Sequence, residues 1–387
     1  MRILIVHARH RELGGEDVVA HGEAALLNAN GHTVHVHDAR NPNGASALAA
    51  FAAAPWNLRQ CRRFESALRE FKPDVVHIHN TWFALSQAVI RAAAQSPAAT
   101  VMTLHNYRLL CADSTLLRDN KICRDCVDGS PWPAIRHRCY RGSLPQSVVA
   151  ASTISLGRIT NLYDGVDRFI APTDLVRDIH IDSGRIDSRH IATISHFLTD
   201  PGPRPHPPSQ STSMIWAGRL APGKGVESLL KAWRTASLQD CDLHIVGDGP
   251  LRATLESSAP ANVHFLGFRP LEETRALIRD ARAFLFVSEW LEPFGLVLLE
   301  ALAPGTPILG FDTGDTRKIV GDSGRLVATG DFDALASQLK TIGNDELDAI
   351  GAASRAHFLR NYTPDIHVRS LESAYEDAVA AKRTRCS

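Results

Sequence analysis

The stretch that decides the fold runs from Ser288 to Glu300 and reads SEWLEPFGLVLLE. An apolar strand is predicted directly before it, over residues 283–287, and the apolar run from Leu296 to Leu302 predicts a buried helix. A strand, a turn and a helix in this order leave unpaired backbone N–H groups where the helix begins, and such groups bind phosphate. The stretch therefore predicts a phosphate-binding turn in an α/β fold.

Two carboxylates stand in this turn and helix, Glu292 and Glu300. A carboxylate repels a phosphate, so a phosphate alone does not explain them. They suit a ligand whose hydroxyl groups flank its phosphates, because a carboxylate accepts hydrogen bonds from hydroxyls. A sugar nucleotide has this chemistry, and we expect one to bind here.

The composition is that of a soluble globular protein. The 387 residues suggest two domains, and 44% of them are hydrophobic and 22% charged. Lys+Arg and Asp+Glu both number 42, so the charge balance gives no argument for a nucleic-acid partner. No apolar run approaches the length of a membrane span. The start, MRILIVH, reads as a β-strand and not as a signal peptide, and seven cysteines without a secretion signal fit a reducing cytoplasm.

Predicted strands and helices alternate along the whole chain, which is typical of doubly wound α/β sheets. A proline-rich run, residues 201–208, reads as a linker, after which the alternation starts again. We expect an N-terminal, acceptor-side domain over residues 1–200 with a cysteine-rich insertion at 106–145. A nucleotide-sugar domain over residues 211–362 and a final helix within 363–387, packed back on the first domain, complete the predicted organisation.

The loop from Gly218 to Gly225 follows a predicted strand and precedes a predicted helix. It carries two cations, Arg219 and Lys224, and each charge-assisted contact with a diphosphate is worth roughly 1.5–3 kcal/mol. The alternative is a solvated loop. The carboxylates that follow later in the chain favour the binding site.

These motifs resemble those of the retaining glycosyltransferases of family four, the glycosyltransferase group 1. In the second half the matching motifs are Gly218-Arg219-Leu220, Lys224-Gly225, IVGDGP at 245–250, Phe265-Leu266-Gly267, EPFGL at 292–296, Glu300-Ala301 and Gly305-Thr306-Pro307. In the first half they are Gly14-Gly15, DVVHIHN at 74–80 and TLHNYRLLC at 103–111. The resemblance implies the GT-B fold, an α/β fold of two doubly wound, Rossmann-like domains that face each other across a cleft.

The resemblance also implies a role for each matched residue of the second half. Arg219 and Lys224 would hold the diphosphate of the donor and stabilise it as it leaves. Glu292 would bind hydroxyls of the transferred sugar, and Glu300 would bind the ribose. Main-chain groups of three residues would meet the phosphates and the sugar: Phe294, Gly295 and Leu296.

The resemblance implies roles for three further residues, among them His105 as the active-site histidine. Gly15 would let the first domain approach the diphosphate, His105 would contact the sugar, and the base would rest near Phe268. One loop departs from the family pattern, because this chain has Thr313-Gly314-Asp315-Thr316-Arg317 where the family has a Gly-Gly pair followed closely by Glu. That departure leaves the identity of the sugar and the nucleotide open.

The implied reaction is transfer of a sugar, with retention, from a UDP- or GDP-linked donor. The acceptor would be a glycan, a glycolipid or a lipid-linked molecule, as in the synthesis of surface polysaccharides or glycoconjugates. Fixed positive charge at the leaving diphosphate is the largest catalytic effect available, and we identify no covalent nucleophile. The Asp-x-Asp triplet from Asp331 to Asp333 reads as a helix N-cap, so no divalent ion is expected to be required for the chemistry.

Four cysteines in the insertion have the spacing of a metal site: Cys111, Cys123, Cys126 and Cys139. Cys-x-x-Cys with two flanking thiols suits tetrahedral zinc, which would order a long loop in a reducing compartment. The alternatives are free thiols or a redox-labile pair. We expect a structural zinc that shapes the acceptor side.

Basic residues cluster in the predicted acceptor-side domain, at Arg59, Arg62, Arg63 and Arg69 and again at Arg136, His137, Arg138 and Arg141. A solvated face explains any one of them. Together they would suit an anionic lipid surface or a lipid diphosphate acceptor. Peripheral contact of a cytoplasmic enzyme with the inner face of the membrane is therefore a further expectation.

Other functions use the same residues. A sugar-nucleotide epimerase of this fold needs no acceptor pocket, which the insertion at 106–145 argues against, and glycosylation of a small-molecule natural product stays open. A glycosidase built on Glu292 and Glu300 conflicts with the phosphate-binding surroundings. A zinc-bearing scaffold or a sugar-nucleotide sensor would not need these carboxylates together with Arg219 and Lys224.

Overall fold

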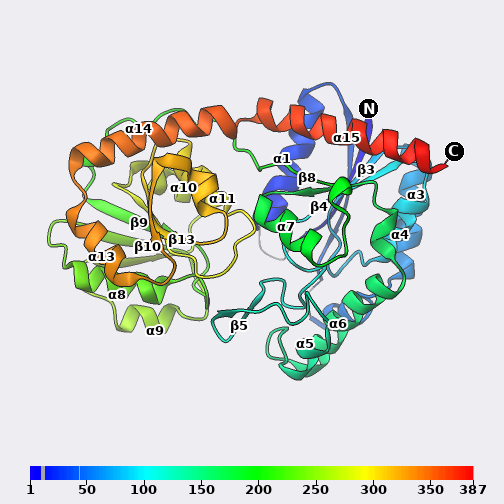
Figure 1. Ribbon diagram of the computed structural model, residues 1–387, viewed down its shortest axis with the longest axis horizontal. Coiled ribbons are helices and arrows are strands. Elements are labelled where there is room, and N and C mark those ends of the chain that lie inside the picture. The colour runs from blue at the N-terminus through cyan, green and yellow to red at the C-terminus, as the bar shows by residue number, and fades with distance from the viewer. Residues whose placement is uncertain (10–13, 43, 387) are drawn as a thin grey trace. The chain divides into compact units, whose positions relative to one another are not determined.

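A computed structural model of the chain describes residues 1–9, 14–42 and 44–386 and divides it into two units of α/β structure (Figure 1). Unit 1 consists of Met1–Arg118, Cys123–His196 and Pro364–Ser387. Unit 2 consists of Asp119–Ile122 and Phe197–Thr363. None of the helices in the described part is long and apolar enough to cross a membrane.

Unit 1 contains a six-stranded parallel sheet in the order β2-β1-β3-β4-β7-β8. Its strands are β1 (Arg2–Arg9), β2 (Thr33–Arg40), β3 (Val75–Asn80), β4 (Ala99–Thr103), β7 (Arg168–Ala171) and β8 (Ile191–Thr193). Its helices are α1 (Gly15–Ala29), α2 (Gly44–Ala52), α3 (Leu58–Phe71), α4 (Ala88–Gln95), α5 (Trp132–Arg136), α6 (Leu144–Ile159), α7 (Asp174–Asp182) and α15 (Pro364–Cys386). The insertion also forms a small hairpin of β5 (Leu117–Arg118) and β6 (Lys121–Ile122).

The last helix, α15, belongs to unit 1 (red in Figure 1). Pro364 begins it, where the missing N–H of proline costs no hydrogen bond. Apolar residues from Val368 to Ala378 recur at helical spacing and pack with Ile3, Ile5 and Val101 of the sheet. The chain thus closes the core of its first unit with its last helix.

Unit 2 contains a second six-stranded parallel sheet, in the order β11-β10-β9-β12-β13-β14. Its strands are β9 (Ser213–Ala217), β10 (Asp242–Val246), β11 (Val263–Gly267), β12 (Phe284–Phe286), β13 (Ile308–Asp312) and β14 (Gly324–Ala328). Its helices are α8 (Val226–Ala236), α9 (Arg252–Ser257), α10 (Leu271–Asp280), α11 (Leu296–Leu302), α12 (Thr316–Val320), α13 (Phe332–Thr341) and α14 (Asn344–Asn361). Helix α11 has the bounds that the sequence predicts.

Both faces of the second sheet are buried, which explains the continuous apolar runs of its strands. Successive side chains of a strand point to opposite faces. Met214 and Trp216 of β9 accordingly pack in one apolar cluster and Ile215 in another. The sheet order reverses between β9 and β12, and ligands of such sheets bind beyond the carboxyl ends of the strands at that point.

The proline-rich run at 201–208 is not the boundary that the sequence suggests. The division falls after His196, and the run is part of unit 2. The Arg204 amide N–H donates to the Pro304 carbonyl, 3.0 Å away, and its guanidinium donates to the Ala281 carbonyl at 2.9 Å. Hydrogen bonds to two segments of unit 2 therefore fix the run to that unit.

Glycines allow the loops after β9 and β12 to touch. Gly225 has a φ of +72°, and a Cβ on it would lie 1.7 Å from the carbonyl oxygen of Val287. The Glu289 N–H also donates to the Gly223 carbonyl at 2.8 Å. Only glycine permits this close approach.

We predict that Gly225→Ala destabilises the protein by about 1–3 kcal/mol more than Gly330→Ala, because the clash with Val287 forces the backbone to move. Gly330 is a matched control, with a φ of +80° and no atom within 4 Å of the added Cβ. Both variants share the left-handed cost of about 1–2 kcal/mol. Urea unfolding checks the difference, and equal losses in the two variants would contradict it.

Buried histidines predict that acid destabilises the protein. Burial lowers the pKa of His77 and of His180 to about 4, while an unfolded chain keeps a histidine pKa of about 6.5. Between these values the unfolded chain binds protons that the folded chain does not. The free energy of unfolding should therefore fall as the pH falls through this window, by up to about 1.4 kcal/mol per pH unit for each histidine.

Urea unfolding at about pH 7.5, 6.5 and 5.5 measures this slope. His180→Gln should make the slope shallower, because one buried group no longer takes up a proton on unfolding. The exposed His137 is the control, and His137→Gln should leave the slope unchanged. A free energy of unfolding that is constant over this range would disprove the prediction.

Candidate active site

The loop after β9 presents Arg219 to solvent. The neighbouring Leu220 is buried, and its N–H donates to the Asp248 carbonyl at 2.9 Å. Gly218 is held in the same way by the Val246 carbonyl at 3.0 Å. The Arg219 side chain is exposed and has no hydrogen-bond or ion-pair partner within the described residues. A fixed backbone therefore carries a cation whose side chain is available to a ligand.

Lys224 and Glu292 form an ion pair through the lysine Nζ and the glutamate Oε1. The pair joins the loop after β9 to the loop after β12, at the point where the sheet order reverses. Lys224 Nζ also lies 5.1 Å from the centre of the Trp290 ring. The two side chains are 27% and 14% exposed, so a ligand can reach both. The structure thus brings together the cation and the carboxylate that the sequence assigns to one site.

Glu300 lies on α11 and is paired with Arg275 of α10. The Arg275 Nε is 3.3 Å from Glu300 Oε1, and its Nη1 is 2.9 Å from Glu272 Oε1. Burial raises the pKa of Glu300, and the charge and hydrogen bond of Arg275 oppose that rise. Sequence reasoning missed Arg275, because its Glu-Glu-Thr-Arg surroundings look like a solvated helix face.

The remaining residues of the predicted donor site are differently placed. The side chain of Phe294 is buried in the core of unit 2 against Tyr362, so only its backbone can meet a ligand. Gly295 precedes α11 with a φ of +78°, and Leu296 begins that helix. Phe268 follows β11 and is 75% exposed, with β10 standing between β11 and β9 in the sheet.

The loop that departs from the family pattern packs beside this site. The Thr313 hydroxyl donates to the Ser288 carbonyl at 2.6 Å, which ties the loop after β13 to the loop after β12. Asp315 is buried at the start of α12, with Lys318 Nζ 3.4 Å from its Oδ1. This acidic side chain thus belongs to the helix start in unit 2.

In unit 1, Gly15 begins α1 and is exposed, and the Gly14 N–H donates to Asp17 Oδ2 at 2.8 Å. The residues just before them, 10–13, lie outside the described part of the chain. His105 follows β4 and is half-buried. Its ring centroid lies 5.2 Å from that of His79 and 5.3 Å from that of His196. His105 is therefore in contact with both rings.

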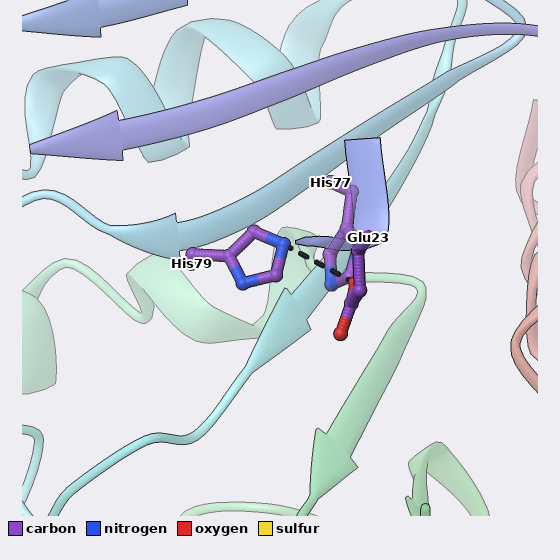
Figure 2. Close-up of side chains that lie close together, drawn as sticks. All are labelled: Glu23, His77 and His79. Atoms are coloured by element: carbon purple, nitrogen blue, oxygen red, sulfur yellow. Dashed lines mark ion pairs between the residues drawn. The ribbon is translucent and has the colours of Figure 1, made fainter. Parts of the chain in front are cut away.

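A buried carboxylate lies behind His105. Glu23 of α1 has its Oε2 3.5 Å from His77 Nδ1 and 3.4 Å from His79 Nε2 (Figure 2). Its Oε1 is 3.2 Å from Nε2 of His367 on α15. Sequence reasoning did not find this cluster, although the i, i+2 spacing of His77 and His79 places both on one face of β3.

Among the described residues, Glu23, His77 and His79 form the only group in which three atoms able to bind a metal lie within 4.8 Å of one another. Both nitrogens of His77 already have partners, the Tyr375 hydroxyl at Nδ1 and the Thr103 hydroxyl at Nε2, each at 2.8 Å. We therefore interpret the group as a hydrogen-bonded network.

The four cysteines of the insertion, Cys111, Cys123, Cys126 and Cys139, line one cavity of about 20 Å³ and are free thiols. Burial, and next the neighbouring Cys111, raises the pKa of Cys126 and of Cys139 to about 11. Among the residues described, no three of these sulfurs lie within 4.8 Å of one another. The fold thus gathers the four thiols without placing them at metal-ligand distances.

Comparisons with known proteins agree with the predicted fold. Sucrose-phosphate synthase from Thermosynechococcus elongatus matches over 98% of this chain and 99% of its own, with a TM-score of 0.73 and 16% identity. The Anabaena protein HepE, solved in complex with UDP, matches over 96% and 99%, with a TM-score of 0.65 and 16% identity. These likenesses and the two parallel sheets confirm the GT-B fold.

Sequence comparisons identify the family. Residues 211–345 match the family model described as Glycosyl transferases group 1, and residues 13–199 match the one described as Glycosyltransferase Family 4. A phosphatidyl-myo-inositol mannosyltransferase of Mycobacterium leprae is 32% identical over 178 residues, which are 44% of this chain and 47% of that protein. The chain spans about half the length of the curated relatives it matches. The two family models cover every motif on which the resemblance depends, and the chain belongs to the glycosyltransferases of group 1, family 4.

Proposed function

We propose that this enzyme transfers a hexosyl group, with retention, from a UDP- or GDP-linked sugar to a carbohydrate or lipid-linked acceptor. The observation that carries the proposal is the Lys224–Glu292 pair at the reversal point of the second sheet, beside the exposed Arg219. Two comparisons support it. One relative is named a mannosyltransferase of phosphatidyl-myo-inositol, and HepE was solved with UDP.

The ion pair gives the donor two opposite charges to engage. A diphosphate attracts the Lys224 ammonium, and the hydroxyls of the transferred sugar donate hydrogen bonds to the Glu292 carboxylate. Each side chain thereby exchanges its present partner for a ligand group, so neither is left unpaired when the donor binds. Arg219 adds a second positive charge where negative charge develops on the leaving group.

Glu300 is proposed to bind the ribose hydroxyls. Its burial disfavours the ionised form, and Arg275 partly offsets this effect by pairing with Oε1. An ionised carboxylate can accept two hydroxyl hydrogen bonds, as the vicinal hydroxyls of a ribose require. Arg275 is thus proposed to hold the ribose-binding group in its ionised form.

Retention is proposed to follow from attack on the same face as the leaving diphosphate, with no covalent nucleophile and no divalent ion. Unit 1 is proposed to supply Gly15, for approach to the diphosphate, and His105, for contact with the sugar. Exposed arginines on α3, among them Arg59, Arg62 and Arg63, make an anionic, lipid-linked acceptor the form we favour, as in surface glycan or glycolipid synthesis.

We predict that a panel of UDP- and GDP-sugars will include a donor from which the enzyme releases nucleotide, faster with a glycan or lipid-linked acceptor present. Arg219→Ala and Lys224→Ala should each lower turnover by about 10²–10³, the scale of losing one charge-stabilising donor. Lys340→Ala removes an exposed lysine from α13 and is the control. Near-normal turnover in both site variants would contradict the site. Conversion of the donor sugar without transfer would indicate an epimerase instead.

We further propose that the cysteine cavity binds one structural zinc ion. About 10–15 Å³ of such space holds one water molecule, so a cavity of about 20 Å³ has room for one small guest between the thiols. The backbone beside the cysteines is unusual, since Ser114, Leu116, Arg138 and Arg141 have φ between +50° and +67°. Such conformations persist where the surrounding structure imposes them, and four zinc–thiolate bonds would do so.

Elemental analysis of the purified protein should find about one equivalent of zinc. Cys126→Ser and Cys139→Ser should lose it and unfold more easily, because the metal would link three segments of the insertion. Cys241→Ser changes a half-buried thiol of unit 2 and should retain the metal. Less than about half an equivalent in the parent protein would refute the zinc site.

A further inference from the structure

We propose that Glu23 and His79 fix the tautomer of His105, so that its Nε2 carries the proton and its Nδ1 accepts a hydrogen bond. Glu23 and His79 would then be positioning residues for the sugar. The part of this inference that concerns catalysis rests on the proposed function, in which His105 contacts the transferred sugar. The part that concerns the tautomer rests on the geometry of unit 1 alone.

The rings of His79 and His105 contact each other through one nitrogen of each. His79 Nδ1 is 2.9 Å from His105 Nε2, a hydrogen-bond distance between two ring nitrogens. One of the two must carry the proton and the other must accept it. The nitrogen that carries the proton in His79 therefore determines which nitrogen carries it in His105.

The other nitrogen of His79 faces a carboxylate. His79 Nε2 lies 3.4 Å from Glu23 Oε2 and has no hydrogen-bond partner among the described residues. A carboxylate oxygen can only accept, and the attraction is strong because both groups are buried. A proton on His79 Nε2 is thus stabilised, whereas a lone pair there would face a negative charge.

His79 carries only that one proton. Burial, together with the nearby His77 and His105, holds the pKa of His79 well below its usual range, so the ring is neutral. A neutral imidazole with its proton on Nε2 has a lone pair on Nδ1. His105 must then donate from Nε2, which leaves the lone pair of a neutral His105 on Nδ1.

Glu23 stays ionised because of His367. The His367 Nδ1 donates to the Ser195 carbonyl, 2.8 Å away, and the His367 Nε2 lies 3.2 Å from Glu23 Oε1. Burial by itself raises the pKa of Glu23, but the hydrogen bond and charge of His367, with the charges of His77 and His105, outweigh it and lower the pKa. The anion that orients His79 is therefore maintained from a third element, α15.

Further histidines lie beside these groups within the described residues. His7 of β1 and His77 of β3 lie beside His79, with ring centroids 6.4 and 4.2 Å away, and the ring centroid of His196 lies 5.3 Å from that of His105. His7 is bound to Asp17 and His77 to two hydroxyls. Within the described part of the chain, Glu23 is the only carboxylate that forms an ion pair with His79.

In the proposed reaction, the tautomer of His105 decides whether its Nδ1 accepts a hydrogen bond from the sugar or donates one. A sugar hydroxyl that meets Nδ1 of His105 must donate its hydrogen to the ring. The carboxylate therefore selects, through His79, a ring that accepts from the sugar rather than one that donates to it. A change of tautomer would turn this attraction into a contact between two donors.

Nitrogen NMR of protein labelled with ¹⁵N-histidine tests the inference without any substrate. His105 is assigned by its loss in His105→Gln, and we expect its Nε2 to be protonated and its Nδ1 not. In Glu23→Gln the amide can donate to His79 Nε2, so the His105 proton should move to Nδ1 or divide between the nitrogens. Tyr375→Phe is the control, because it disturbs the same buried cluster through His77 and should leave the His105 tautomer unchanged.

Kinetics then separates the two parts of the inference. Glu23→Gln should lower kcat by about 10-fold or more with little change in the donor KM, as for other groups that orient a reacting side chain. Tyr375→Phe should change kcat less than about 2-fold at temperatures where it is folded. A proton on Nδ1 in the parent protein, an unchanged tautomer in Glu23→Gln, or a bound metal ion that Glu23→Gln removes would overturn the inference. Failure to transfer sugar from any donor, with the predicted tautomer intact, would refute only the proposed function.

Discussion

The ion pair between Lys224 and Glu292 is the interaction on which the proposed donor site depends. It exists because two neighbouring parallel strands end at the same edge and Gly225 lets their loops come into backbone contact. The pair is partly exposed, so each charge is stabilised by the other yet remains within reach of a ligand. A buried pair would bind its ligand only after a large desolvation cost, and a fully exposed pair would hold neither side chain in place. Partial exposure meets both requirements.

The carboxylate of Glu23 in unit 1 differs from this partly exposed pair. Glu23 is buried among histidines from two elements, and its partners come from within the protein. No ligand needs to displace them. A buried anion of this kind acts through the proton positions that it imposes on its neighbours, because each neutral ring has one proton to place. In our proposal, Glu23 of unit 1 thus fixes the proton position of His105. In unit 2, Lys224 and Glu292 can instead exchange partners with a ligand.

The sequence predicts those parts of the fold that local patterns determine. The apolar run before and after Ser288 locates β12 and α11, and the glycine-bearing motifs locate the loops that carry Lys224 and Glu292. The missed partners, Arg275 of Glu300 and His367 of Glu23, lie far away in sequence and meet them only through packing. The prolines at 201–208 mislead for a related reason. Their composition reads as a linker, and hydrogen bonds to distant segments decide where they belong.

A second carboxylate, Asp315, lies near the proposed donor site in the loop after β13. The loop after β13 departs from the family pattern at 313–317, and Asp315 there is buried at a helix start with Lys318 nearby. Thr313 closes the space beside this loop by its bond to the Ser288 carbonyl. A carboxylate held in that way has less freedom to exchange partners than Glu292, whose cation can move to the diphosphate. Glu292 is therefore the carboxylate that we propose for binding the transferred sugar, and we propose that the neighbouring loop contributes shape more than charge.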